Sequence, residues 1–216
     1  MRPTFAWPYA ALLVAGLCLS SCSCRPQSAP PAPGVTKGTG AYIGEKADLK
    51  PDADPGPKAK LVLAGTVIPV EVKVKPAGED FAIDLWYNGE LFEEEQYKDG
   101  ATGFSLVNAA GETYSPPITL LMFPMNIGDS WKWSGQMLTG PAGRDATAVV
   151  RTLSDKVDTG TQEEALLVEV DLSMYSGNTS QPAQRRLSFW FVRNKGLLKR
   201  EFGSSTSRVP FDAKTE

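Results

Sequence analysis

The sequence of 216 residues contains no histidine. Histidine is the commonest general base and the commonest ligand of transition metals in proteins. Its absence excludes every nucleophile that a Ser-His or Cys-His pair would activate. An enzyme with this sequence would have to use acidic residues. We therefore expect a protein without catalytic activity, and we assign it no catalytic residue, metal or cofactor.

Cysteine is absent from the part of the chain that is expected to fold. The three cysteines are Cys18, Cys22 and Cys24, all close to the N-terminus. A domain that begins after them has no thiol and no disulfide, so its hydrophobic core must hold it together. Beyond Leu19 no run approaches 18 consecutive apolar residues, and we expect no membrane-spanning helix there.

An excess of positive charge is missing as well. The chain has 22 basic and 25 acidic residues, a net charge of -3. Removal of residues 1–21 would take away one basic residue, Arg2, and no acidic one, which changes the balance from -3 to -4. Such a surface does not attract a polyanion, so nucleic acid is not expected as a partner.

The chain begins with a short apolar segment. The run from Ala10 to Leu19 has ten residues and follows Arg2. A membrane-spanning helix needs about 20 apolar residues, so this run is typical of a secretion signal. It ends in Leu19-Ser20-Ser21-Cys22. These four residues resemble the lipobox of bacterial lipoproteins, and the resemblance implies cleavage between Ser21 and Cys22 and lipidation of Cys22.

Lipidation would place the protein at a membrane of the cell envelope. In the enterobacterial lipoproteins that this start resembles, an aspartate after the lipidated cysteine retains the protein at the inner membrane. Here Ser23 follows Cys22, and we expect the outer membrane, with the protein facing the periplasm. The alternative is an ordinary signal peptide cut nearby, which would leave a soluble protein whose Cys22 and Cys24 are free or bridged.

Composition divides the rest of the chain into three parts. Residues 23–58 include seven prolines and five glycines and few apolar residues, which predicts a disordered tether over 22–58. Drawn out as polyproline II, such a tether would reach about 110 Å. Residues 59–203 are expected to form the folded domain. The Ser- and Thr-rich end, 204–216, is expected to be a flexible tail.

The pattern of apolar residues within 59–203 predicts strands. Val70, Val72 and Val74 alternate with charged residues, as in a half-buried strand. Asn88-Gly89 is the dipeptide that best suits a two-residue hairpin turn. Further turn signals follow about every ten residues. We predict an all-β domain, a meander of about ten mainly antiparallel strands with little helix, which closes as a barrel, a half-barrel or a sandwich.

Two phrases in the C-terminal half carry a second resemblance. Pro116 to Gly135 contains Gly128-Asp129-Ser130-Trp131, and Gly196 to Phe202 reads Gly-Leu-Leu-Lys-Arg-Glu-Phe. Both are similar to a pattern in secreted β-rich bacterial proteins, many of which have no assigned activity. The overall plan also resembles the Lol-type lipoprotein carriers, whose curved antiparallel sheet holds acyl chains. That resemblance implies an apolar ligand, although the helices that line those carriers are not evident here.

Four tryptophans are the candidates for a ligand or partner surface. They are Trp86, Trp131, Trp133 and Trp190. Large aromatic side chains bury much area and are frequent at interfaces, and packing in the core is the alternative. Gly128-Asp129, by contrast, is interpreted as a turn in which the aspartate accepts hydrogen bonds from nearby backbone.

Two charged clusters are interpreted as surface charges rather than as a functional site. Among Glu93, Glu94 and Glu95 the alternation turns Glu94 away from the other two, and we expect protective charges on an edge strand. A calcium site or a glycosidase acid pair is the alternative. Arg185-Arg186 is expected to be solvated, or to meet an anionic head group.

The sequence thus favours a lipid-anchored, non-catalytic envelope protein. It would be joined to the membrane through the N-terminal lipid and present its β domain for protein contact or envelope assembly. One alternative is a carrier of a lipid or other apolar ligand in a curved sheet. The other is an enzyme that uses acidic residues.

Overall fold

The computed structural model describes residues 34–41, 43–50, 59–63, 66–140, 142–158, 160–175 and 181–203. The expected signal peptide, the cleavage site at Ser21, the lipidation site at Cys22 and the expected tail at 204–216 all lie outside these residues.

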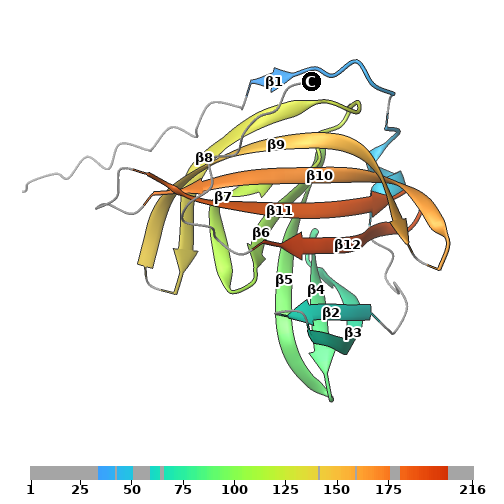
Figure 1. Ribbon diagram of the computed structural model, residues 1–216, viewed down its shortest axis with the longest axis vertical. Coiled ribbons are helices and arrows are strands. Elements are labelled where there is room, and N and C mark those ends of the chain that lie inside the picture. The colour runs from blue at the N-terminus through green and yellow to red at the C-terminus, as the bar shows by residue number, and fades with distance from the viewer. Residues whose placement is uncertain are drawn as a thin grey trace, which may run out of the picture. The chain divides into compact units, whose positions relative to one another are not determined.

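The described chain forms one antiparallel sheet in which β2 to β12 follow one another in sequence order (Figure 1). The short β1 pairs with the first residues of β8. The sheet curls into a half-barrel, so the predicted all-β meander with little helix is confirmed. The elements are β1 (Val35–Thr36), the 3-10 helix η1 (Lys46–Leu49), β2 (Ala59–Leu63), β3 (Thr66–Ala77), β4 (Asp80–Tyr87), β5 (Glu90–Gly100), β6 (Gly103–Ala109), β7 (Glu112–Thr119), β8 (Ser130–Thr139), β9 (Ala142–Asp158), β10 (Gln162–Met174), β11 (Ala183–Val192) and β12 (Gly196–Phe202).

Short turns connect the strands where the sequence indicates them. Asn88 and Gly89 join β4 to β5 with φ angles of 51° and 82°. Both positions of this turn therefore have positive φ, which is the reason that asparagine followed by glycine is preferred there. Ala110 and Gly111 join β6 to β7 in the same way, with φ angles of 52° and 71°.

The two faces of the sheet carry separate hydrophobic clusters. On β11, Phe189 and Phe191 belong to the large cluster and Trp190 to the small one, because neighbouring residues of a strand point to opposite faces. The large cluster fills the concave side of the half-barrel. Its largest fully buried side chains are Trp131, Tyr97, Tyr114, Phe104, Phe189, Phe191, Ile83, Leu106, Ile118, Leu120, Leu121 and Met125.

An ion pair crosses the concave side between β5 and β12. Arg200 Nε donates to Glu95 Oε1, and the Tyr97 hydroxyl donates to the other carboxylate oxygen at 2.8 Å. Six strands lie between β5 and β12 in the sheet order, so only a curled sheet brings these side chains together. Burial raises the pKa of the Glu95 carboxyl, and the attraction of Arg200 acts against that shift.

A second, similar group crosses between β7 and β11. Arg185 Nη1 donates to both oxygens of Glu112 at 2.6 and 2.7 Å, and the Tyr114 hydroxyl donates to Glu112 at 3.0 Å. The interpretation of Arg185 as a solvated charge is therefore wrong. The expectation of an edge strand at Glu93, Glu94 and Glu95 is also wrong, because β5 is an inner strand of the sheet. Glu95 in addition faces the core.

The predicted tether is wrong for residues 34–41 and 43–50, which we call the strap. Val35 pairs with Trp131 across β1 and β8, and Leu49 is 2% exposed in the main core. The glycines that suggested disorder instead allow close contact. A Cβ atom on Gly38 would lie 2.3 Å from the Ile127 carbonyl oxygen, so no other residue fits without a shift of backbone.

Candidate functional site

Three of the four candidate tryptophans do not form a surface. Trp131 and Trp133 are buried in the main core, and their Nε1 atoms donate at 2.9 Å to the carbonyl oxygens of Thr119 and Pro116. Trp190 is buried in the small cluster and donates to Asp155 at 2.7 Å. The prediction of a ligand or partner surface is wrong at these three positions, and core packing, the alternative, accounts for them.

Trp86 is the exception, since it is half-buried on the convex face of β4. Lys73 Nζ lies 4.4 Å from the centre of its ring system, a cation–π contact between β3 and β4. Its Nε1 atom has no hydrogen-bond partner among the described residues. Its register partner on β5 is Leu91, which is exposed, so Trp86 adjoins an apolar part of the surface.

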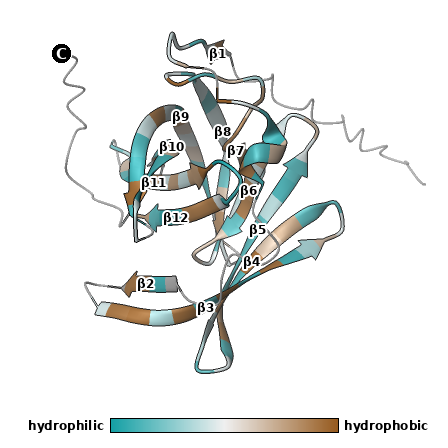
Figure 2. Cartoon of the chain, turned by 90° about the vertical axis from the view of Figure 1, so that its right-hand side faces the viewer, coloured by the Kyte–Doolittle hydropathy of each residue, from teal (hydrophilic) through white to brown (hydrophobic). Residues whose placement is uncertain are grey.

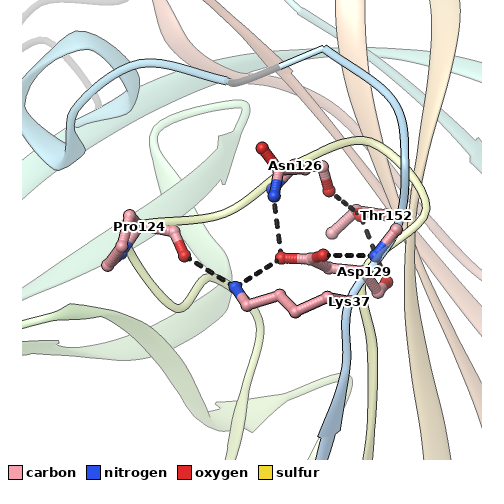
Figure 3. A network of polar contacts seen from close by, with 6 residues as sticks. Lys37, Pro124, Asn126, Asp129 and Thr152 are labelled. Atoms are coloured by element: carbon pink, nitrogen blue, oxygen red, sulfur yellow. Dashed lines mark hydrogen bonds and ion pairs between the residues drawn. The ribbon is translucent and has the colours of Figure 1, made fainter.

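Asp129, the aspartate of the Gly-Asp-x-Trp phrase, holds the strap (Figure 3). Its side chain is 1% exposed, and it accepts hydrogen bonds from Gly38 N at 2.7 Å, Asn126 N at 3.0 Å and Lys37 Nζ at 3.0 Å. The bond from Asn126 is the expected turn contact. The two bonds from the strap are not visible in the sequence.

The charge of Asp129 is stabilised by these contacts. Burial alone would raise the pKa of the carboxyl, but the hydrogen bonds from Gly38, Lys37 and Asn126 outweigh burial and hold the pKa below its usual value. Asp99 on β5 holds the other end of the strap. Its carboxylate accepts hydrogen bonds from the ammonium groups of Lys46 and Lys50 at 2.5 and 2.8 Å. Its pKa is also lowered, against the effect of burial.

Exposed apolar side chains gather at one place in the described chain, which we call the arm. The arm consists of β2, the first part of β3 (residues 66–70) and the β4–β5 turn (residues 87–92). Six large hydrophobic side chains are exposed in the described residues, and five of them lie in the arm. They are Val62, Val67, Tyr87, Leu91 and Phe92, and the sixth is Tyr175, which directly follows β10.

The β2–β3 part of the arm is a two-stranded ribbon. β3 pairs with β4 only from Glu71 onward, and residues 66–70 pair with β2 alone. Lys60 is the one charged residue in the two paired segments. In both views β1 lies at the top and β2 and β3 lie in the lower part, and Figure 2 shows brown, hydrophobic segments on both strands.

The three consecutive glutamates do not form a shared site. Glu93 accepts a hydrogen bond from Ala110 N, Glu94 pairs with Lys75 at 2.8 Å on the opposite face, and Glu95 belongs to the buried pair. Over the residues that the structure describes, no group of three or more Cys, Asp or Glu side chains is placed to hold a metal ion. The same residues include no helix of the length and apolarity needed to cross a bilayer.

A sequence signal for the arm did exist. Residues 61–63 and 67–70 are apolar without alternation, whereas a strand with one solvated face alternates.

Comparison of the chain with protein-family models, with curated proteins and with solved structures found no match.

Proposed function

We propose that this protein is a lipid-anchored, non-catalytic component of the cell envelope that contacts a partner protein through its arm. The observation that carries the proposal is the concentration of exposed apolar side chains there, with Val62 at 61% and Val67 at 57% exposure. Exposed apolar residues that occur singly are ordinary, but a group of them on adjoining strands is typical of an interaction surface.

The packing of the half-barrel favours protein contact over carriage of a lipid. A carrier needs apolar surface inside its curved sheet, and here that side is filled by large side chains such as Phe104, Tyr114 and Phe189. The Glu95–Arg200 pair also crosses it. The apolar surface that is open to a partner lies on the outside, in the arm.

The proposed anchor is the lipid on Cys22, and Ser23 favours the outer membrane. The strap begins at Gly34, so eleven residues, 23–33, separate Cys22 from it. Eleven residues span at most about 40 Å. β1 and the arm lie toward opposite ends of the longest axis in Figures 1 and 2, so this short connection would keep β1 near the membrane and direct the arm away from it.

Intact mass tests the anchor. Protein purified from its native membrane should carry the mass of about three acyl chains on Cys22, and Cys22→Ser should lose it.

Site-specific photo-crosslinking in cells tests the partner. A crosslinker at Phe92 should capture one dominant protein, whereas one at Tyr175, which is also exposed and apolar but outside the arm, should not. Equal capture from both positions would contradict a role of the arm.

A further inference from the structure

The arm contains backbone groups that no strand of the described chain satisfies. β2 pairs with β3 on one side, and its other side is an edge of the sheet. Residues 66–70 of β3 also have a free side, because β4 pairs with β3 only from Glu71. A hairpin of two strands is at best marginally stable in water on its own. Three strands with a covered apolar face are much more stable.

The direction of these groups follows from the hairpin. Two residues join β2 to β3, and Leu63 and Thr66 pair directly on either side of them. In a two-residue hairpin this closing pair exchanges both of its hydrogen bonds, and pairs with and without such bonds then alternate. The backbone N–H groups of Lys60 and Val62 therefore point outward from β2.

The edge of β2 is better suited to another strand than the edge of β3. Pro69 pairs with Lys60, so it occupies an outward position of β3 and has no N–H to donate. Val67 is then the one outward donor of residues 66–70, whereas β2 has two. β12, the other end of the sheet, carries exposed charged side chains, Lys199 and Glu201, which protect an edge strand in the usual way.

We propose that a strand of a partner protein pairs with the outer edge of β2, and this rests on the proposed function. The added strand would satisfy the N–H groups of Lys60 and Val62. It would also meet apolar side chains on both faces, with Val62 and Val67 on one face and Leu61 and Ile68 on the other. The fitting partner segment is therefore extended, about five residues long, and apolar on both sides.

Insertion of the ribbon into a membrane is disfavoured by the same groups. In hydrocarbon, every backbone N–H and C=O needs a partner within the protein, and open sheet edges are not found there. The ribbon has two open edges. A protein strand provides hydrogen bonds and apolar contact together, whereas a bilayer provides apolar contact alone.

The test uses two substitutions of Val62 in the full-length, lipidated chain, with a photo-crosslinker at Val67 on the neighbouring strand. Val62→Pro removes an outward N–H without touching a β2–β3 hydrogen bond. Val62→Thr keeps that N–H and has nearly the same shape. We expect Val62→Pro to reduce the crosslinked partner about tenfold, the effect of roughly one backbone hydrogen bond. Val62→Thr should leave it within about twofold.

A second measurement does not depend on a substitution. In the purified protein alone, the amide hydrogens of Lys60 and Val62 should exchange rapidly with solvent. In the complex both should be protected, while the amide of Leu61, which already pairs with β3, should change less. Thermal melting of both Val62 variants checks that the core is unchanged.

The outcomes separate the possibilities. A partner captured equally by Val62→Pro and Val62→Thr refutes strand pairing but leaves contact through the arm in place. Absence of an arm-dependent partner refutes the proposed function itself. A dimer that sediments as such and is lost in Val62→Pro overturns the inference in favour of a second copy of this chain. Val62-dependent flotation of Cys22→Ser protein with phosphatidylethanolamine–phosphatidylglycerol vesicles overturns it in favour of a membrane.

Discussion

Replacement of Asp129 by alanine should release the strap. The side chain is 1% exposed and accepts two backbone N–H groups, from Gly38 and Asn126, and the ammonium of Lys37. Each buried donor that loses its acceptor costs about 1–3 kcal/mol. A released strap can return the Gly38 N–H to water, which limits the total, and we expect a loss of roughly 2–4 kcal/mol in the free energy of unfolding.

Lys37→Ala is the matched control. It removes the ion pair with Asp129 but leaves both backbone donors satisfied, and because Lys37 is 56% exposed, the pair contributes at most about 1 kcal/mol. Urea unfolding gives both free energies. Hydrogen exchange at Gly40 and Ile43, whose N–H groups bond to Ile127 and Met125, reports on the strap directly. If the two variants lost equal stability, or if Asp129→Ala left these two amides protected, the reasoning would be refuted.

Three further predictions concern the strap and the interior. Gly38→Ala should destabilise the strap on the order of 2 kcal/mol, because its Cβ would meet backbone at 2.3 Å, and faster proteolysis within 34–50 would report it. Asp129 and Asp99 have pKa values below the usual value for aspartate in the folded protein. The stability that they provide is therefore present above about pH 4 and is lost as the pH falls through their folded pKa values. Hydrogen exchange of strap amides, measured from pH 6 to 3, should show release of the strap before global unfolding. Arg200→Ala should cost about 3–5 kcal/mol in urea unfolding, because it leaves Glu95 buried without its partner, and Arg200→Met combined with Glu95→Gln should cost less; equal losses would argue against a penalty from the unpaired charge.

Local patterns predicted the meander well, because strands and tight turns are specified by nearby residues. Alternation along β3 and the Asn88-Gly89 turn each depend on a few neighbours, and both are found as expected. Alternation also shows which residues share a face. It does not show which face is covered when both are apolar, so it leaves open whether Trp190 packs in the core or meets a partner. The side chain is buried.

Contacts between distant residues could not be predicted in this way. Glu95 and Arg200 are 105 residues apart, and their pairing depends on how far the whole sheet curls. The prediction of a disordered tether failed at the strap for another reason. Its composition is that of a disordered segment, but Asp129, Ile127 and Trp131 provide a surface on which it docks. Average composition measures how much apolar area a segment can bury by itself, and it does not include a preformed surface.

The Gly-Asp-x-Trp phrase has a role that its turn alone does not explain. Asp129 holds Lys37 and Gly38, and two residues later Trp131 pairs with Val35 while its side chain lies in the core. The phrase therefore joins the strap to the interior of the domain. If Cys22 carries the lipid, the contact of Asp129 with Lys37 and Gly38 is the first point at which the membrane anchor constrains the position of the domain. Release of residues 34–43 would lengthen the connection from residues 23–33 to residues 23–43, from about 40 Å to about 75 Å when fully extended, while Asp99 and Leu49 still hold the far end of the strap. The arm would then no longer be directed away from the membrane, although its own residues would be unchanged. Asp129→Ala should therefore weaken capture of a partner from the arm in cells while leaving binding by the purified protein intact.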